Sequence, residues 1–316
     1  MTTSPLLAPC TRPTMYFVGV TTGSSSIMKV FPQWSKILDL GAEIKGYDAP
    51  LHAPAEYYRN IVQHIKTDPL AMGALVTTHK IDLLDATRDL FGYLDPYAQL
   101  CGEISSISKL DGRLEGHAKD PITSGLAWQT LVPPKHWERT NGHVLCLGAG
   151  GAAISISVYL AQIHDRADLP QKLIAVDRMQ SRLDSLQAIL SRLNSEIAFE
   201  YICNDDLLRN DALMASLPAG SMVINATGMG KDRPGSPITD AGRFPQDGIV
   251  WELNYRGELD FLHQAKRQMQ TRNLVVEDGW VYFLHGWSQV IAQVFHLNLT
   301  PELFNALDSA AAIIRS

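Results

Sequence analysis

A glycine-rich run in the middle of the chain constrains the fold more than any other feature. Residues 144–160 read VLCLGAGGAAISISVYL, an apolar strand that breaks into glycines and resumes as an apolar stretch. In such a strand–turn–helix unit the first glycine permits a sharp turn, and the second lets a pyrophosphate approach the backbone. The N–H groups at the start of the new helix also attract the anion. This run therefore predicts a dinucleotide site that includes Gly148, Gly150, Gly151 and Ala152.

A second apolar strand supports this interpretation over a purely structural strand–helix–strand turn. Residues 173–176 are apolar and lead directly to Asp177. A carboxylate here can accept hydrogen bonds from the ribose hydroxyls of an adenosine and would repel a 2′-phosphate, which favours NAD. Arg178 and Arg182 favour the alternative, NADP, because guanidinium groups pair with phosphate. We expect NAD as the cofactor, with NADP possible.

Composition indicates a well-packed globular protein and excludes some partners. The 316 residues suit two domains, 46% of them are hydrophobic and 19% are charged. The net charge of −6 and the lack of a basic cluster argue against nucleic acid. We see no signal peptide and no membrane span, so we expect a cytoplasmic protein and no membrane partner. The oligomeric state is left open.

The cysteines and histidines predict neither a disulfide framework nor a metal site. The four cysteines are widely scattered, and two of them lie in expected strands. The ten histidines show no pairing at helical spacing that would gather ligands on one face. The sequence thus predicts reduced thiols and no metal.

Strand-like and helix-like segments alternate throughout, which predicts an α/β fold. Residues 1–125 and 280–316 are expected to form a substrate-binding α/β domain, to which the C-terminal helices return. Residues 126–279 are expected to form a Rossmann-type, doubly wound nucleotide-binding domain. An Asp-Gly turn at residues 111–112 predicts a hairpin between strands at 104–108 and 113–117. The expected strands of the second domain are residues 144–147, 173–176, 199–203, 222–225 and 249–253.

Taken in order, six motifs resemble those of the shikimate/quinate dehydrogenase family. One is the glycine-rich turn. The others are GALVTTHK at 73–80 (family N-V-T-x-P-x-K), GHAKD at 116–120 (G-x-N-T-D), DRMQSR at 177–182 (N-R-T-x-x-R), INAT at 224–227 (I-N-A-T) and ELNY at 252–255 (D-x-x-Y). The resemblance implies two domains with substrate bound in the cleft between them, and reversible hydride transfer between NAD(P) and a ring hydroxyl of a small carboxylated cyclitol such as shikimate or quinate.

The resemblance implies that Lys80 and Asp120 are the catalytic pair. Each follows an expected strand, at the edge where open α/β sheets place ligands. Oxidation of an alcohol needs a group that takes the hydroxyl proton reversibly. Without the motif register, Lys80 would be interpreted as a solvated loop residue and Asp120 as a helix cap.

The remaining site residues are also assigned by this resemblance. Ser24 and Ser26, in a strand-to-helix turn, would hold the substrate carboxylate, although this turn is one residue shorter than usual and such serines also serve as caps. Ser105, Tyr255 and Gln289 are further substrate-side candidates. Thr227, Gly228 and Met229 would lie near the nicotinamide ribose.

Several positions depart from the family pattern and make shikimate itself doubtful. A site that hydrogen-bonds substrate hydroxyls discriminates by those contacts, so their loss changes specificity. We expect Lys119 to point to solvent, with attraction of a second anion as the alternative. The departures are Ala74, Ser105-Ser106, Ala118, Lys119 and Gly286.

Two other functions remain open. A methylenetetrahydrofolate dehydrogenase shares the general architecture but requires neither Ser24 and Ser26 nor an acid beside Lys80. A catalytically silent metabolite sensor would explain an altered pocket, but it need not retain Lys80 and Asp120.

Overall fold

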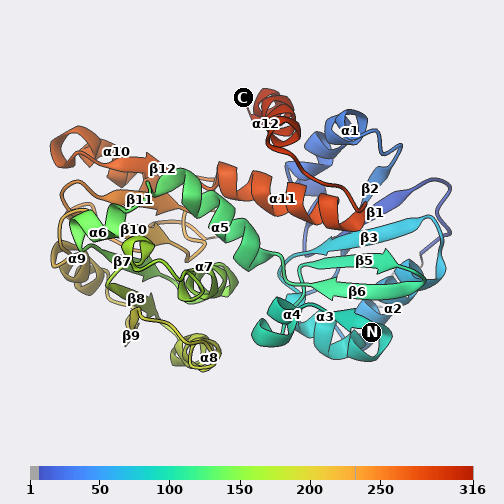
Figure 1. The fold of residues 1–316 in the computed structure, drawn as a ribbon, viewed down its shortest axis with the longest axis horizontal. Coiled ribbons are helices and arrows are strands. Elements are labelled where there is room, and N and C mark those ends of the chain that lie inside the picture. The colour runs from blue at the N-terminus through green and yellow to red at the C-terminus, as the bar shows by residue number, and fades with distance from the viewer. Residues whose placement is uncertain (1–6, 232, 316) are drawn as a thin grey trace. The chain divides into compact units, whose positions relative to one another are not determined.

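The computed structural model describes residues 7–231 and 233–315, which divide into two compact units (Figure 1). The first unit contains the chain up to Lys119 and the segment from Gly286 onward. The second unit is the intervening segment, from Asp120 to His285. Each unit is built around one six-stranded sheet.

The first unit carries a mixed sheet. Its strands are β1 (Thr14–Gly19), β2 (Glu43–Asp48), β3 (Ala71–Val76), β4 (Tyr93–Leu94), β5 (Ser106–Leu110) and β6 (Arg113–His117). Their order is β2-β1-β3-β5-β6-β4, and β5 pairs antiparallel with both β3 and β6. The predicted hairpin is present, and its turn residues Asp111 and Gly112 have φ of 50° and 77°, as a two-residue hairpin turn requires.

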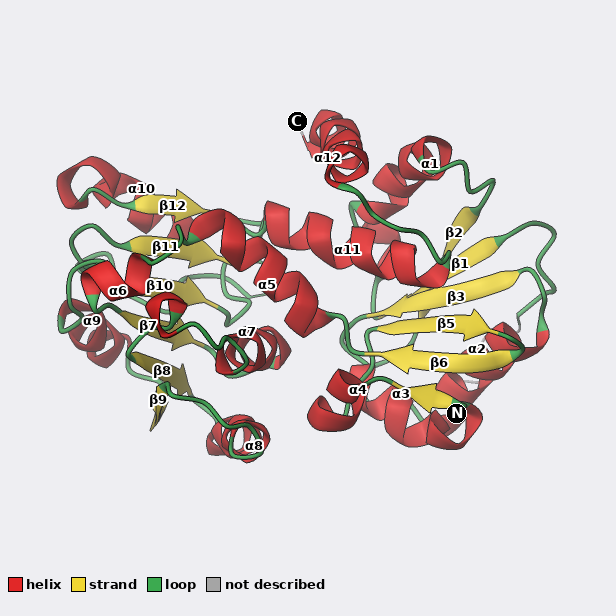
Figure 2. Ribbon diagram, in the orientation of Figure 1, coloured by secondary structure: helices red, strands yellow, loops and turns green. Residues whose placement is uncertain are grey.

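Helices cover this sheet, as the secondary-structure view shows (Figure 2). They are α1 (Ile27–Ile37), α2 (Ala55–Thr67), α3 (Lys80–Thr87), α4 (Pro96–Cys101), the later part of α11 (Trp280–Val294) and α12 (Pro301–Arg315), with 3₁₀ turns at Thr22–Ser24 and Arg88–Leu90. Tyr16 and Val18 of β1 pack in one core with α2 and α3. Phe17, which points to the opposite face, packs edge-on against Trp287 of α11. Both faces of β1 are therefore buried.

The C-terminal helix returns to the first unit, as the sequence predicts. Trp34 of α1 is fully buried, and its indole Nε1 donates a 2.8 Å hydrogen bond to the main-chain oxygen of Leu307 in α12. This bond links two helices that are 273 positions apart in the sequence.

The second unit has an all-parallel, doubly wound sheet. Its strands are β7 (His143–Leu147), β8 (Lys172–Asp177), β9 (Ala198–Cys203), β10 (Met222–Asn225), β11 (Ile249–Glu252) and β12 (Val275–Glu277). Its helices are α5 (Asp120–Leu131), α6 (His136–Thr140), α7 (Gly151–Ala161), α8 (Gln180–Leu190), α9 (Leu207–Ala215), α10 (Asp260–Arg272) and the first part of α11, with a 3₁₀ turn at Arg166–Asp168.

The strand order β12-β11-β10-β7-β8-β9 is that of a Rossmann sheet. Winding reverses between β7 and β10, which are neighbours although two strands intervene in the sequence. Parallel strands covered on both faces need continuous apolar runs, and those of β7 and β10 are fully buried. Ligands bind outside the carboxyl ends of the strands at such a reversal point.

The expected strands of this unit are present, and the structure adds one that the sequence analysis missed. Strand β12 has three residues, two of them exposed, so it has no apolar run to reveal it. The polar, proline-containing segment 132–142 contains the short helix α6. Among the described residues, no helix is long and apolar enough to cross a bilayer.

Candidate functional site

The turn after β7 has the geometry that its glycines predict. Gly148 has φ of 108°, and a Cβ on it would lie 2.6 Å from the main-chain oxygen of Ala226, a contact that no larger residue can make. A Cβ on Gly150 would meet nothing within 4 Å. Gly150 is also the N-cap of α7 and has no side chain with which to cap the helix. The turn thus leaves open space beside helical N–H groups, where an anion fits.

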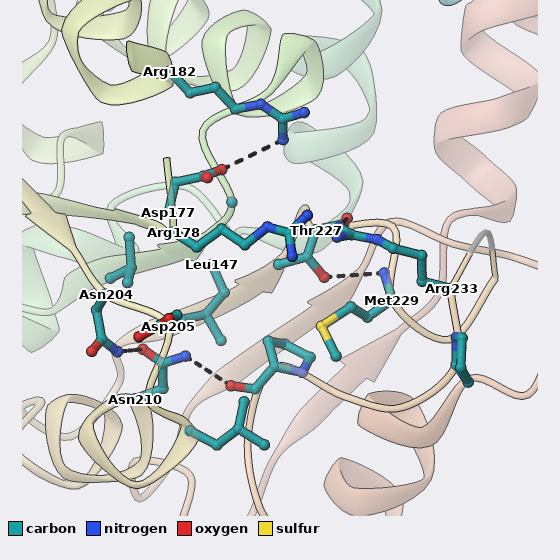
Figure 3. A pocket seen from close by; sticks show the side chains of 15 residues that line it. Leu147, Asp177, Arg178, Arg182, Asn204, Asp205, Asn210, Thr227, Met229 and Arg233 are labelled. Atoms are coloured by element: carbon teal, nitrogen blue, oxygen red, sulfur yellow. Dashed lines mark hydrogen bonds and ion pairs between the residues drawn. The ribbon is translucent and has the colours of Figure 1, made fainter. Parts of the chain in front are cut away.

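A cavity of about 320 Å³ lies next to this turn (Figure 3). It is lined from the ends of β7, β8 and β10 and from the segment that follows β10. Most of the predicted cofactor residues converge there although they come from different parts of the sequence. Those that line it are Gly148, Asp177, Arg178, Arg182, Thr227 and Met229.

Asp177 is anchored by backbone amides. Its Oδ2 accepts a 2.9 Å hydrogen bond from the N–H of Ala149, and its Oδ1 accepts one of the same length from the N–H of Met179. The residue is 7% exposed, and the guanidinium of Arg182 lies 3.7 Å from Oδ2. Asp177 therefore ties the glycine-rich turn to the end of β8 and presents a fixed negative charge at the cavity wall.

Three arginines line the same cavity. Arg178 and Arg182 are exposed, and Arg233, which the sequence analysis did not select, donates a 2.9 Å hydrogen bond to the main-chain oxygen of Thr227. The cavity thus combines one buried carboxylate with several exposed cations, which can attract phosphate groups.

A buried polar network holds the segment from Thr227 to Met229. The Oδ1 atom of Asn225 accepts hydrogen bonds from both the N–H and the hydroxyl of Thr227, at 3.1 and 2.7 Å. The side-chain amides of Asn225 and Asn254 donate to the main-chain oxygen of Met229. Strand ends at β10 and β11 therefore fix the conformation of the predicted nicotinamide-side loop.

Glu252 supports this loop through Asn225 and Asn254. The sequence indicates it only as the first residue of the motif at 252–255. It is fully buried and accepts hydrogen bonds from Asn225 Nδ2 at 2.7 Å and from the N–H and side chain of Asn254 at 2.8 and 2.7 Å. Burial raises the pKa of Glu252 to about 7, against the opposing effect of these hydrogen bonds. The loop is thus supported by a carboxyl that titrates near neutrality.

In the first unit, Lys80 begins α3 shortly after β3 ends. Its Nζ lies 3.9 Å from Oε1 of Glu103, and the side chains are 18% and 9% exposed. No sequence motif indicates Glu103, which follows α4 in a loop. Asp120 belongs to the second unit, where it is the first residue of α5. A buried carboxylate thus accompanies Lys80 within its own unit.

The other predicted substrate residues have varied surroundings. The hydroxyl of Ser24 donates to the main-chain oxygen of Thr21, and Ser26 is the N-cap residue of α1. The hydroxyl of Ser105 accepts a 2.9 Å hydrogen bond from the N–H of Lys119. Gln289 is half-buried in α11, and the ring of Tyr255 packs against Trp280 and Phe283.

The structure corrects the expectation for Lys119. Its side chain does not point to solvent: it is half-buried, and Nζ donates a 3.0 Å hydrogen bond to Oε1 of Gln293 on α11. Burial lowers the pKa of Lys119, and the charge of Asp95 opposes that shift. Ala74, another departure, is fully buried in the core against α2 and α3.

Comparison with known sequences gives distant relatives of one kind. No protein-family model matches the chain. It is 29% identical to a shikimate dehydrogenase (NADP(+)) of Lactococcus lactis subsp. cremoris over 182 residues, 57% of this chain and 60% of the relative. It is 28% identical to that of Streptococcus thermophilus over 176 residues, 55% of this chain and 57% of the relative. The chain therefore spans about 60% of the length of these curated relatives.

Solved structures share the fold over nearly the whole chain. Shikimate 5-dehydrogenase from Thermus thermophilus in complex with shikimate has a TM-score of 0.70 at 19% identity and covers 96% of this chain and 98% of its own. Quinate dehydrogenase from Corynebacterium glutamicum in complex with NAD scores 0.72 at 18% identity, covering 94% and 99%. The ligand-free 5-ketofructose reductase of Gluconobacter sp. strain CHM43 scores 0.72 at 18% identity, covering 96% and 99%.

The fold and the cavity define a two-unit α/β protein with a Rossmann-type nucleotide-binding unit. The distant relatives and the motif order support the shikimate/quinate dehydrogenase family for this chain, and the solved shikimate and quinate dehydrogenases share its fold.

Proposed function

We propose that this protein is an NAD(P)-dependent oxidoreductase that reversibly transfers hydride between the nicotinamide and a ring hydroxyl of a small carboxylated cyclitol. The observation that carries the proposal is the convergence of six sequence-selected cofactor residues on one cavity at the reversal point of a parallel sheet. The names of the relatives support the substrate class: shikimate and quinate are both carboxylated cyclitols.

The cavity and its turn fit a dinucleotide. The pyrophosphate would lie in the open space beside Gly150, against the N-terminal N–H groups of α7. Asp177 would face the adenosine ribose, with Arg178 and Arg182 beside it. When bound, the cofactor supplies a nicotinamide that accepts or gives a hydride. The Asp177 carboxylate, which two backbone amides hold in place, favours NAD over NADP because its negative charge would repel a 2′-phosphate.

Lys80 and Asp120 are proposed as the catalytic pair. During alcohol oxidation, hydride leaves the carbon and the hydroxyl proton passes to the neutral amine of Lys80; the reverse reaction returns that proton. Glu103, 3.9 Å from Nζ, would hold the amine in place and is proposed as a positioning residue. The assignment of Asp120 rests on its place in the motif at 116–120.

Substrate recognition is proposed to begin at the turn before α1. Ser24 and Ser26 carry hydroxyls at the N-terminal end of that helix, where a carboxylate would be stabilised. Ser105, Tyr255 and Gln289 would contact the ring. Because Ala74 packs in the apolar core, one polar contact of the family is absent, which favours a substrate other than shikimate.

An open-chain or ketose substrate is the second candidate. The altered residues motivate it, and the likeness in fold to a 5-ketofructose reductase supports it. Such a substrate would use the same cofactor and the same proton-handling lysine but would not need a carboxylate site at Ser24 and Ser26.

A substrate panel tests both candidates. Carboxylated cyclitols and polyols would be offered with NAD and NADP, and their keto forms, 5-ketofructose included, with the reduced cofactors, while absorbance of the reduced nicotinamide is followed. We expect turnover with a carboxylated cyclitol and faster reaction with NAD. Turnover with ketoses alone would replace the first candidate by the second. Tight cofactor binding without turnover across the panel would support the metabolite sensor instead.

A further inference from the structure

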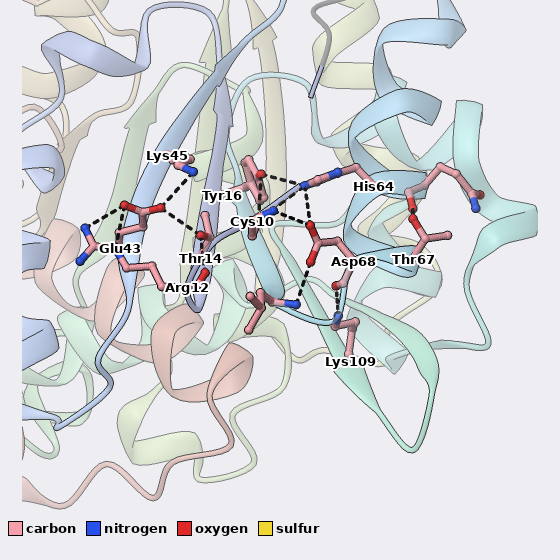
Figure 4. A network of polar contacts seen from close by, with 12 residues as sticks. Cys10, Arg12, Thr14, Tyr16, Glu43, Lys45, His64, Thr67, Asp68 and Lys109 are labelled. Atoms are coloured by element: carbon pink, nitrogen blue, oxygen red, sulfur yellow. Dashed lines mark hydrogen bonds and ion pairs between the residues drawn. The ribbon is translucent and has the colours of Figure 1, made fainter. Parts of the chain in front are cut away.

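A thiol, an imidazole and a carboxylate converge in the first unit, among residues that the proposed reaction does not use (Figure 4). Cys10 Sγ lies 3.7 Å from His64 Nε2, which lies 3.9 Å from Asp68 Oδ2. All three ligand atoms are within 4.8 Å of one another. In the part of the chain that the structure describes, this is the one group of three or more such side chains that could hold a metal ion.

Local structure brings these atoms together. His64 is in the last turn of α2 and Asp68 is its C-cap residue, so their spacing places both on one side of the helix end. Cys10 lies just before β1, and its N–H donates a 2.7 Å hydrogen bond to Oδ2 of Asp68. Oδ1 of the same carboxylate accepts a 2.8 Å bond from the N–H of Leu70. Two backbone donors thus orient the carboxylate while each oxygen keeps a lone pair.

The arrangement differs from that of a nucleophile–histidine–acid relay. In such a relay the acid binds the ring nitrogen opposite the one that faces the nucleophile. Here the thiol and the carboxylate both face Nε2 of His64. Three ligand atoms within 4.8 Å of one another are close enough to share one metal ion. Ligands of a tetrahedral ion at metal–ligand distances of about 2.0–2.3 Å are about 3.3–3.8 Å apart, close to the 3.7 and 3.9 Å observed.

We propose that Cys10, His64 and Asp68 bind one zinc ion. Sulfur, imidazole nitrogen and carboxylate oxygen together suit Zn²⁺ and exclude the hard cations Mg²⁺ and Ca²⁺. Binding forms the sulfur–zinc bond and releases the thiol proton to solvent. The thiolate and the carboxylate then balance the two charges of the ion.

Tyr16 lies beside two of the proposed ligand atoms. Its hydroxyl lies 2.8 Å from His64 Nε2 and 3.4 Å from Cys10 Sγ. The nearby amines are bonded elsewhere: Lys109 Nζ donates to the main-chain oxygen of Asp68 at 2.8 Å, and Lys45 Nζ lies 2.9 Å from Glu43. Cys10 is 8% exposed and the side chains of His64 and Asp68 are each 10% exposed. A zinc ion at this largely buried site would cross-link the segment before β1 to the C-terminal end of α2.

Cobalt titration tests this proposal directly. Full-length protein without an affinity tag would be stripped with a chelator, dialysed and titrated with CoCl₂. We expect a thiolate-to-cobalt charge-transfer band that saturates at one ion per chain, disappears on addition of ZnCl₂, and accompanies the release of a proton. ZnCl₂ should also raise the melting temperature of the stripped protein by about 4 °C or more. A wild-type protein with neither the band nor the stabilisation would overturn the proposal.

Matched cysteine variants locate the ion. C10S should lose the band and bind cobalt at least about 100-fold more weakly. C203S, which removes an exposed thiol in the second unit, should behave as wild type. An unchanged band in C10S would show that the ion binds elsewhere and would overturn the assignment.

Asp68→Asn provides a second variant that keeps the thiol. It should keep the charge-transfer band but weaken cobalt binding, and unchanged cobalt affinity would show that Asp68 is not a ligand. None of these measurements depends on dehydrogenase activity.

Discussion

Asn225, at the end of β10, donates a 2.7 Å hydrogen bond from its side-chain amide to Oε2 of Glu252, at the end of the neighbouring strand β11. The same asparagine fixes Thr227 through its carbonyl oxygen. Asn225 therefore connects a buried carboxyl directly to the loop from Thr227 to Met229.

Glu252→Gln should change how stability depends on pH. Burial raises the pKa of Glu252 from its ordinary 4.5 to about 7. Its stabilising effect is therefore complete below pH 4.5 and is lost as the pH rises to about 7. The wild type should lose about 3 kcal/mol relative to the variant over this range. Denaturant unfolding of both proteins near pH 4.5 and about one unit above pH 7 measures how the free energy of unfolding changes with pH. The same change in both proteins would contradict the raised pKa of Glu252.

Two glycine substitutions in one turn should have different effects. G148A places a Cβ 2.6 Å from a main-chain oxygen at a φ of 108°, so we expect a loss of several kcal/mol of stability or failure to fold. G150A meets nothing within 4 Å and should fold as wild type. It should nevertheless bind NAD at least about tenfold more weakly if the pyrophosphate fills that space. Thermal denaturation and calorimetric titration measure the two effects. Unaltered NAD affinity in G150A would move the pyrophosphate elsewhere.

Asp177→Asn should shift cofactor preference towards NADP. The change removes a fixed charge that opposes a 2′-phosphate and leaves Arg178 and Arg182 to attract it. We expect the ratio of kcat/KM for NAD to that for NADP to fall about tenfold, equivalent to about 1.4 kcal/mol. Asp184→Asn, an exposed change on α8, serves as the control. A constant ratio would show that Asp177 does not face the adenosine ribose.

Trp34→Phe should loosen the C-terminal helix. The variant loses the hydrogen bond to Leu307 and part of a fully buried side chain. We expect a loss of about 1–3 kcal/mol in the free energy of unfolding. Gln33→Ala, an exposed change on the same helix, should have little effect. Chemical denaturation compares the two, and equal stability of both variants would argue against a structural role for this bond.

Features set by local sequence were predictable. The glycine turn at Gly148 and the hairpin at Asp111 and Gly112 require particular backbone angles, so their residue types identify them. The long apolar strands of the second unit were recognised because burial on both faces gives continuous apolar runs.

Features set by tertiary contact were not predictable. Strand β12 owes its place to pairing with β11 and has no pattern of its own. Glu103 lies in a loop outside every motif, and only the tertiary structure of the first unit brings it to Lys80. Lys119 was expected in solvent because the position of Gln293, distant in sequence, could not be inferred.

The proposed reaction requires Lys80 to move the proton during hydride transfer. With the best substrate of the panel, Lys80→Met should lower kcat by about 10²–10⁴-fold while the Kd for NAD stays within about twofold, since Lys80 does not line the cofactor cavity. Lys36→Met, an exposed lysine of the same unit, is the control. A Lys80→Met enzyme with wild-type kcat would contradict the proposed chemistry.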